Sequence, residues 1–228
     1  MLLSNVKEIE IPEGKVKQIA KGSEILWKKN SLTFVNAIIG TGTQFINLGK
    51  KIKQNYRFEL LIQSTSLTNS TSNKIFGAKV ESGNWPNGLS VLIYTGQNPY
   101  FYKNGYNYSQ ITKGFWESGR DFLFHNTDNS LVIDRVLNGS VAETVTVNVG
   151  GNLSRQCREA FLFSYNAEEG NEFQCGKFKF KSLKVYDENG VLVMDIVPAI
   201  DSEGVPCVVD LVDNRILYNA GTGVFGYE

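Results

Sequence analysis

Apolar and polar residues alternate with a period of two along much of this sequence. In RFELLIQ at 57–63, Phe58, Leu60 and Ile62 fall on one side of an extended strand. The β-branched segments SLVIDRV at 130–136 and ETVTVNV at 143–149 follow the same pattern, and LSVLIY at 89–94 repeats it. No helical period persists beyond about two turns. Many alternating strands without intervening helices predict an all-β sandwich or barrel.

Two Asn-Gly dipeptides are the strongest turn signals, because this pair tolerates the backbone of a tight hairpin. They lie in FYKNGYNY at 101–108 and in RVLNGSVA at 135–142. A two-residue loop in the first hairpin places Tyr102 opposite Asn107. In FKFKSLKVY at 178–186 the apolar phase slips by one residue after Phe180, which predicts a β-bulge.

The chain divides into an N-terminal β-strand attachment segment at 1–30 and a main domain at 31–228. VKEIEI, KVKQIAK and EILWKK are separated by Pro-Glu-Gly and Gly-Ser turn signals, which predicts three short strands. This segment is too short to enclose a core. We therefore expect its strands to pair with the main domain or with another chain.

Charge and cysteine content exclude several function classes. The chain has 23 basic and 23 acidic residues, so it lacks the positive field of a nucleic-acid or anionic-membrane binder. Three scattered cysteines do not suit a disulfide framework or a thiolate zinc site. The sequence shows no signal peptide and no apolar run that spans a bilayer, so synthesis in a cytoplasm is expected.

Three segments carry a resemblance to a known family: IIGTGTQFINLG at 38–49, SLVIDRVLNGSV at 130–141, and 182–225, which closes on GTGVF. They resemble the concanavalin A-like, laminin-G-type jelly-roll domains of phage and prophage virion proteins and of some gut-bacterial surface proteins. The resemblance implies a jelly-roll β-sandwich over roughly residues 32–228. VKQIAKGSEILWKK at 16–29 resembles the short strand unit that opens many phage tail-associated proteins.

Catalytic patterns are sparse. His125 is the single histidine, so a multi-histidine metal site is excluded and any Ser-His-acid arrangement must use it. The clustered Glu-x-Asp-x-x-Glu of related jelly-roll glucanases is missing. The nearest acidic groups lie at expected turns, where acids are common, and they are Glu168-Glu169, Asp187-Glu188, Asp201 with Glu203, and Asp210 with Asp213. We expect a protein that is not an enzyme.

Calcium is the one cofactor that the sequence suggests. A two-residue loop at Asn138-Gly139 sets Asp134 opposite Glu143, where two carboxylates repel unless a cation, a proton or water intervenes. Many laminin-G-type domains bind calcium at a sheet edge. A solvated face is the alternative. The loop at 210–214, with Asp210 and Asp213, is a second candidate.

Loop aromatics are the candidate ligand contacts. Aromatic rings stack on the C–H face of sugars while amides bind hydroxyl groups. The candidates lie in ESGNWPNG, FYKNGYNY and KGFWESG, and they are Trp85, Asn87, Tyr102, Asn107 and Trp116. Since one face of the hairpin must enter the core, about half of its tyrosines are expected to be structural.

Three functions remain open. The first is a virion component, tail-associated or on the head, which forms homo-oligomers and meets other virion proteins or host-surface carbohydrate. The second is a free or cell-surface carbohydrate-binding module. The third is a glycoside hydrolase. Localisation follows the function, in the virion for the first and at the bacterial cell surface for the second.

Overall fold

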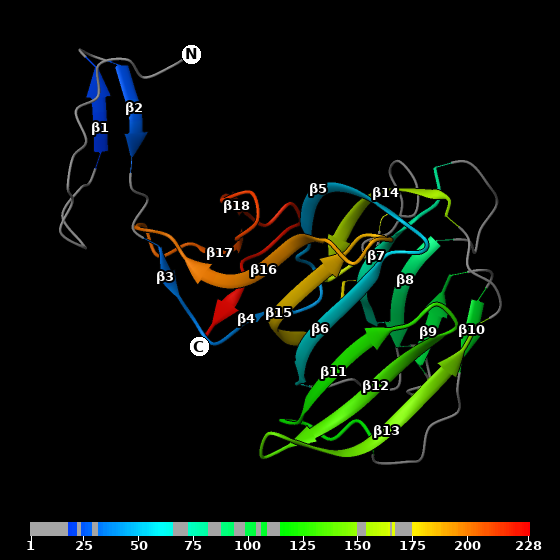
Figure 1. The fold of residues 1–228 in the computed structure, drawn as a ribbon. Coiled ribbons are helices and arrows are strands. Elements are labelled where there is room, and N and C mark those ends of the chain that lie inside the picture. Colours follow the sequence, from blue (N-terminus) through cyan, green and yellow to red (C-terminus); the bar gives the residue numbers. More distant parts are fainter. Residues whose placement is uncertain are drawn as a thin grey trace.

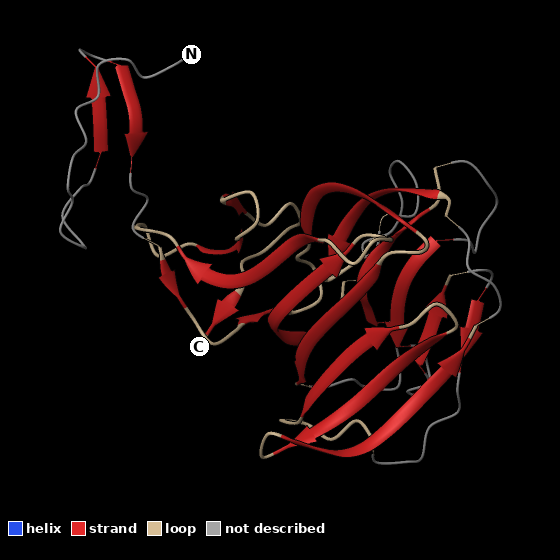
Figure 2. Ribbon diagram, viewed as in Figure 1, coloured by secondary structure: helices blue, strands red, loops and turns tan. Residues whose placement is uncertain are grey.

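The computed structural model describes residues 18–21, 24–28, 32–65, 73–81, 88–93, 99–103, 106–108, 115–149, 154–164, 166 and 175–228. Within these ranges every regular element is a β-strand, which confirms the predicted all-β class (Figure 2). No helix in the described part of the chain is long and apolar enough to cross a membrane.

Two antiparallel sheets face each other and form a sandwich (Figure 1). The smaller sheet has six strands in the order β10-β9-β8-β7-β14-β5. Their bounds are β5 (Ile46–Lys53), β7 (Asn73–Lys79), β8 (Gly88–Ile93), β9 (Pro99–Tyr102), β10 (Tyr106–Tyr108) and β14 (Gln156–Leu162).

The larger sheet has eleven strands, and its main path is β13-β12-β11-β6-β15-β16-β17-β18. Those strands are β6 (Arg57–Ser64), β11 (Asp121–Asn126), β12 (Ser130–Leu137), β13 (Ser140–Asn148), β15 (Phe178–Tyr186), β16 (Leu192–Ile200), β17 (Pro206–Asp210) and β18 (Arg215–Leu217). Three short strands join beside this path: β3 (Thr33–Phe34), β4 (Ile38–Ile39) and β19 (Gly226–Tyr227).

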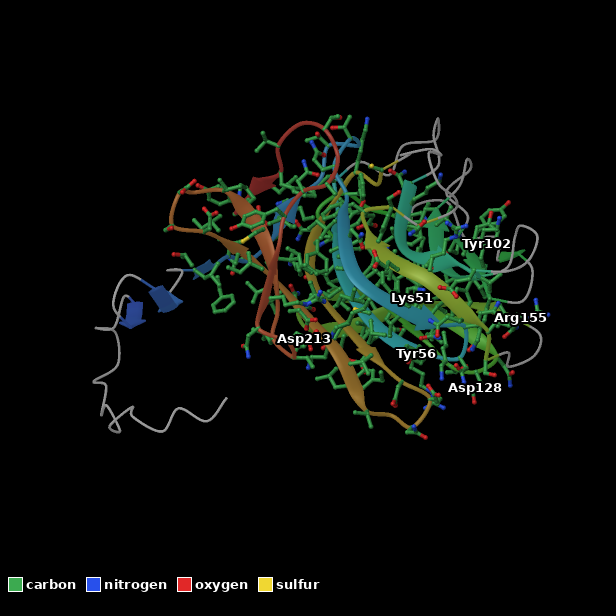
Figure 3. All side chains as sticks on the ribbon, turned by 90° about the horizontal axis from the view of Figure 1, so that it is seen from above. Lys51, Tyr56, Tyr102, Asp128, Arg155 and Asp213 are labelled. Atoms are coloured by element: carbon green, nitrogen blue, oxygen red, sulfur yellow. The ribbon has the colours of Figure 1, made fainter. Side chains whose placement is uncertain are left out.

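Side chains fill the space between the sheets (Figure 3). On β6, Phe58, Leu60 and Ile62 are buried in this core, as the alternating pattern predicts. The bulge predicted in β15 is also confirmed, because the register against β6 shifts between Phe180 and Ser182. This shift keeps both the earlier and the later apolar residues of β15 in the core.

The first Asn-Gly hairpin forms, but its predicted register is wrong by one residue. Tyr102 pairs with Tyr106 and Asn107 pairs with Phe101, so three residues at 103–105 separate the paired positions. Lys103 is the first of these three residues, and its side chain is fully buried. Its ammonium donates hydrogen bonds to backbone carbonyls of the β11–β12 turn, at 3.1 Å from Thr127 and 2.9 Å from Asp128.

The second Asn-Gly hairpin has the predicted two-residue turn. Asn138 and Gly139 adopt φ values of 51° and 76°, as a type I′ turn requires, and Leu137 pairs with Ser140. A bulge follows, because the β12–β13 register shifts between Arg135 and Val136. The register beyond this bulge therefore differs from the one that the turn alone predicts.

The N-terminal segment contains a hairpin of β1 (Gln18–Lys21) and β2 (Glu24–Lys28). These strands form a two-stranded sheet of their own, to one side of the two large sheets in Figure 1. Two of the three expected strands are thus confirmed, and the third, at 6–11, lies outside the described residues.

Candidate functional site

Trp116 is a core residue, so its prediction as a ligand contact was wrong. Its side chain is only 7% exposed. Its ring centroid lies 4.6 Å from that of Phe122, 4.9 Å from Phe115 and 5.9 Å from Phe124. The KGFWESG segment does contain a turn, but apolar packing draws both of its rings between the sheets.

Tyr102 lies on the outer face of the six-stranded sheet, because its neighbour Phe101 points into the main core. With Leu92 and Tyr100 it forms a small apolar cluster and is 5% exposed, so its ring is covered. Asn107 is on β10, opposite Phe101. Contact between Asn107 and a ligand stays a prediction. The same holds for Trp85 and Asn87, which lie outside the described residues.

Asp134 and Glu143 do not form the predicted carboxylate pair. The bulge places Asp134 opposite Thr144, while Glu143 pairs with Arg135. The Asp134 carboxylate accepts a hydrogen bond from the Thr144 hydroxyl at 2.6 Å and lies 3.0 Å from Nε2 of His125. Because Glu143 forms an ion pair with Arg135 at 3.1 Å, the two carboxylates have separate partners on opposite faces of the strands. The cross-strand pairing of two carboxylates, on which the calcium prediction depended, is therefore wrong.

At the second calcium candidate, the acidic side chains form ion pairs with basic side chains of the same chain. Lys50 Nζ lies 3.0 Å from Asp210 and 2.8 Å from Asp213, and Arg215 lies 3.3 Å from Asp213. Basic side chains of the protein therefore neutralise both carboxylates. No group of three or more metal-ligating side chains occurs within the described ranges.

Cysteine and aspartate side chains act as nucleophiles or acid–base groups in many enzymes. In this structure the three cysteines are buried, and two aspartates bind the backbone of turns. Burial raises the pKa of Cys157 to about 12, and the pKa values of Cys175 and Cys207 to about 11.

Asp187 Oδ1 accepts hydrogen bonds from the backbone N–H groups of Asn189 and Val191, both at 2.8 Å. Asp201 binds the turn after β16 in the same way. The turn role predicted for these acids is confirmed.

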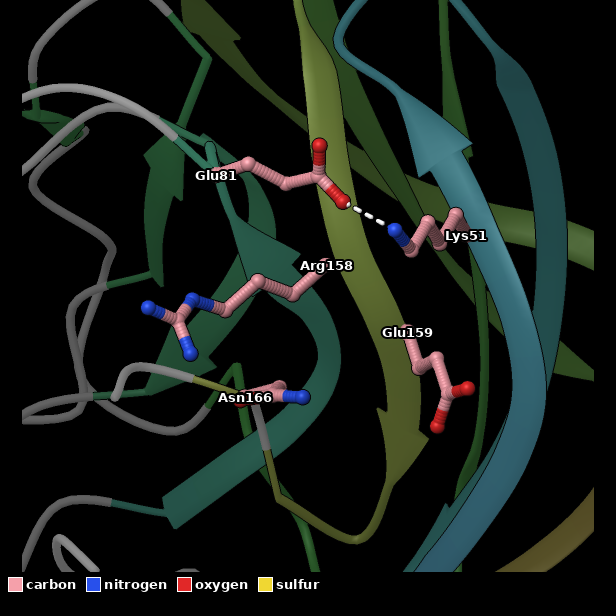
Figure 4. A pocket seen from close by; sticks show the side chains of 5 residues that line it. All are labelled: Lys51, Glu81, Arg158, Glu159 and Asn166. Atoms are coloured by element: carbon pink, nitrogen blue, oxygen red, sulfur yellow. Dashed lines mark ion pairs between the residues drawn. The ribbon is translucent and has the colours of Figure 1, made fainter. Parts of the chain in front are cut away.

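A polar hollow of about 340 Å³ opens on the outer face of the six-stranded sheet (Figure 4). On β14, Ala160 and Leu162 point into the core, so Glu159 and Phe161 point outward. Arg158 also reaches the hollow, because the β14–β5 register shifts between Gln156 and Glu159. Such an irregularity lets two successive side chains reach one face.

Neighbouring segments supply the other lining residues. Lys51 comes from β5, where it pairs with Glu159 across the ladder. Glu81 follows β7 and is positioned by its backbone N–H, which donates to Gln156 at 3.1 Å. Asn166 is held beside β7, because its carbonyl accepts a hydrogen bond from the Lys79 N–H at 2.8 Å. Four separate stretches of sequence thus meet in one hollow.

Most charges in the hollow have protein partners. Lys51 Nζ lies 2.5 Å from a Glu81 oxygen, and this hydrogen bond raises the pKa of Lys51. Asn47 donates a hydrogen bond to Glu159 at 2.8 Å. Each carboxylate keeps lone pairs that can accept further hydrogen bonds.

Arg158 is the exception among these charges. Within the described ranges, no acceptor pairs with its guanidinium, and its Nε is buried without a hydrogen-bond partner. Leaving a buried donor unsatisfied costs about 1–3 kcal/mol, and more for a charged group. Arg158 therefore keeps N–H donors that can bind a further acceptor.

An aromatic surface continues along β14 from the hollow. Phe161 lies two residues beyond Glu159 on the same face and is partly exposed. Its ring stacks on Phe45 with centroids 4.9 Å apart. None of these residues is among the ligand contacts predicted from the sequence. The one sequence signal is QCREAFL, where two successive charged residues interrupt an alternating strand and mark its irregularity.

The facing antiparallel sheets and this surface hollow define the class of protein: an all-β sandwich with a polar hollow on one sheet. None of the protein-family models compared with the chain matches it, and the search of curated proteins found no similar sequence.

Proposed function

We propose that this protein is a non-enzymatic structural component of a phage or prophage virion, tail-associated or on the head. A concanavalin A-like, laminin-G-type jelly-roll domain at 31–228 attaches to a host-surface glycan or to a neighbouring subunit. The strands within 1–30 join the protein to other virion proteins or to further copies of itself. The protein is made in the cytoplasm of a bacterial host and is then located in the virion.

The path of the chain supports the jelly-roll architecture. It enters the six-stranded sheet with β5, crosses to the larger sheet with β6, and returns for β7 to β10. It then forms β11 to β13 in the larger sheet, β14 in the smaller one, and β15 to β18 in the larger one again. Repeated crossing between two facing antiparallel sheets is typical of jelly rolls.

The polar hollow with Arg158 is the observation that carries the binding role. Its volume of about 340 Å³ falls within the usual range of small-ligand sites, roughly 300–1,000 Å³. It offers a charged donor from Arg158 and acceptors from Glu81 and Glu159, and the Phe161 ring lies two residues further along the same face of β14. Sugars present hydroxyl groups and an apolar C–H face, so this surface suits a saccharide.

The N-terminal hairpin supports the attachment role. In the described part of the chain, β1 and β2 are hydrogen-bonded to each other and to no other strand. An isolated two-stranded hairpin is only marginally stable in water. An edge of this hairpin that pairs with no described strand can add a strand of a partner by β-augmentation.

A free or cell-surface carbohydrate-binding module is the alternative, because the same hollow serves it. Light scattering coupled to size-exclusion chromatography of the full chain separates the two functions. The virion function predicts a stable dimer or trimer, and the free module predicts a monomer. A glycan array tests attachment, and electron microscopy of particles from the source tests the location. A monomer that is missing from particles would contradict the virion function, and turnover of a polysaccharide would favour the hydrolase.

A further inference from the structure

We propose that the hollow recognises a carboxylate-bearing saccharide, such as one containing a uronic or sialic acid, with Arg158 as the group that binds the carboxylate. This proposal rests on the proposed attachment to glycans and specifies the chemistry of the ligand. It follows from the distribution of charges among five lining residues: Lys51, Glu81, Arg158, Glu159 and Asn166.

The pairing of the charges identifies Arg158 as the anion-binding group. Lys51 forms an ion pair with Glu81, and the negative charge of Glu159 also acts on it. Arg158 has no acceptor within the described ranges, and its Nε is buried without a partner. A guanidinium presents its N–H groups as a planar fork, which matches the two oxygens of a carboxylate.

The hollow as a whole favours a singly charged ligand. Its two basic and two acidic side chains have a formal sum of zero. A doubly charged phosphate group would gain one guanidinium contact but would also face Glu81 and Glu159. A carboxylate places a single negative charge beside Arg158, so the repulsion is smaller.

The remaining polar groups favour a saccharide over an acidic peptide. The free lone pairs of Glu81 and Glu159 accept hydrogen bonds, and a saccharide supplies many hydroxyl donors. The Asn166 side chain both donates and accepts. The Phe161 ring, on the same face of β14 as Glu159, offers an apolar surface for the C–H groups of a second sugar. An acidic peptide would bring additional carboxylates toward the two glutamates.

The test compares matched saccharides on the full-length protein by isothermal titration calorimetry. Each probe is an oligosaccharide that contains galacturonate, glucuronate or N-acetylneuraminate, and its control is the same oligosaccharide with the carboxylate reduced to an alcohol. We expect at least one acidic probe to bind tenfold or more tightly than its reduced counterpart. Added salt should weaken this preference.

Variants then assign the preference to one side chain. Arg158→Gln should bring the affinity ratio between the acidic and the reduced probe close to one, and Arg158→Lys should leave an intermediate ratio. Arg155→Gln is the matched control, because it removes the same charge from an exposed position three residues earlier (Figure 3). It should keep the full ratio. The melting temperature of Arg158→Gln should match that of the wild type, since the guanidinium has no partner in the described chain.

Failure of this proposal is distinguishable from failure of the proposed function. Equal binding of acidic and reduced probes, or a preference that survives Arg158→Gln, overturns the carboxylate proposal and leaves glycan attachment intact. Tighter binding of an acidic tripeptide than of every acidic saccharide overturns it as well. If no saccharide of either kind binds, the carboxylate proposal is overturned, and a glycan array without any signal then refutes glycan attachment itself.

Discussion

Replacing Trp116 with alanine separates a core role for this residue from a ligand-binding role. The side chain is 7% exposed and contacts three aromatic rings, with centroid distances of 4.6, 4.9 and 5.9 Å. Truncation of a buried Phe or Trp to alanine costs about 3–5 kcal/mol, since it removes apolar contacts and leaves a cavity. Each aromatic pair adds about 0.5–1.5 kcal/mol beyond its buried area. We therefore expect the free energy of unfolding to fall by about 4 kcal/mol.

Urea denaturation followed by far-ultraviolet circular dichroism measures this loss without relying on the tryptophan signal. A loss of this size lowers the melting temperature of a domain this long by about 8–16 °C, at about 2–4 °C per kcal/mol. Phe34→Ala is the control, because Phe34 is 60% exposed and its truncation should cost less than about 1 kcal/mol. If Trp116→Ala changed stability as little as Phe34→Ala but abolished glycan binding, Trp116 would face a ligand and the core assignment would be refuted.

Three further predictions concern the turns and the thiols. Gly139→Ala should destabilise the fold by about 1–2 kcal/mol in urea titrations, because Gly139 has a φ of 76° and no atom within 4 Å obstructs a methyl group, so the cost is conformational. If Gly139→Ala cost no more than the same substitution at a position with ordinary β geometry, the type I′ turn would be contradicted. The three thiols should resist an aromatic disulfide reagent at pH 8 until the protein unfolds, because burial raises their pKa values to about 11 or 12; fast labelling of the folded protein would refute this. Backbone hydrogen bonds, led by those from Val191 and Val205, lower the pKa values of Asp187 and Asp201. Their contribution to stability is therefore present above the unfolded pKa of about 3.9 and is lost as the pH falls through the lowered folded values. The double variant Asp187→Asn/Asp201→Asn should show a shallower loss of stability between about pH 5 and pH 2, and an unchanged slope would count against these turn contacts.

Features that depend on local backbone geometry could be predicted from the sequence. Alternation with a period of two identifies strands, because successive side chains of an extended chain point to opposite faces. Asn138-Gly139 identifies a type I′ turn, because both positions need a positive φ. The phase slip after Phe180 identifies the bulge in β15, because only an extra residue keeps both apolar sets in the core.

Features that depend on contacts between distant segments could not be predicted in this way. The register at Tyr102 accompanies a buried Lys103, whose ammonium donates hydrogen bonds to carbonyls of a turn 24 and 25 residues further along the chain. The partner of Asp134 changed because a bulge followed the turn, and the turn sequence does not encode that bulge. Trp116 points inward because it completes an aromatic cluster whose members include residues of β11.

The candidate site also depends on contacts between distant segments, whereas the strands and turns depend on neighbouring residues. The sequence by itself determined that the chain forms strands and where several of them turn, since those properties depend on neighbouring residues. Only the tertiary structure decided that Lys51, Glu81, Arg158 and Asn166 line one hollow, since four segments must pack before these side chains meet. Only packing also decided that Arg158 has no acceptor in the described chain, because the partners of a charge depend on which segments lie beside it.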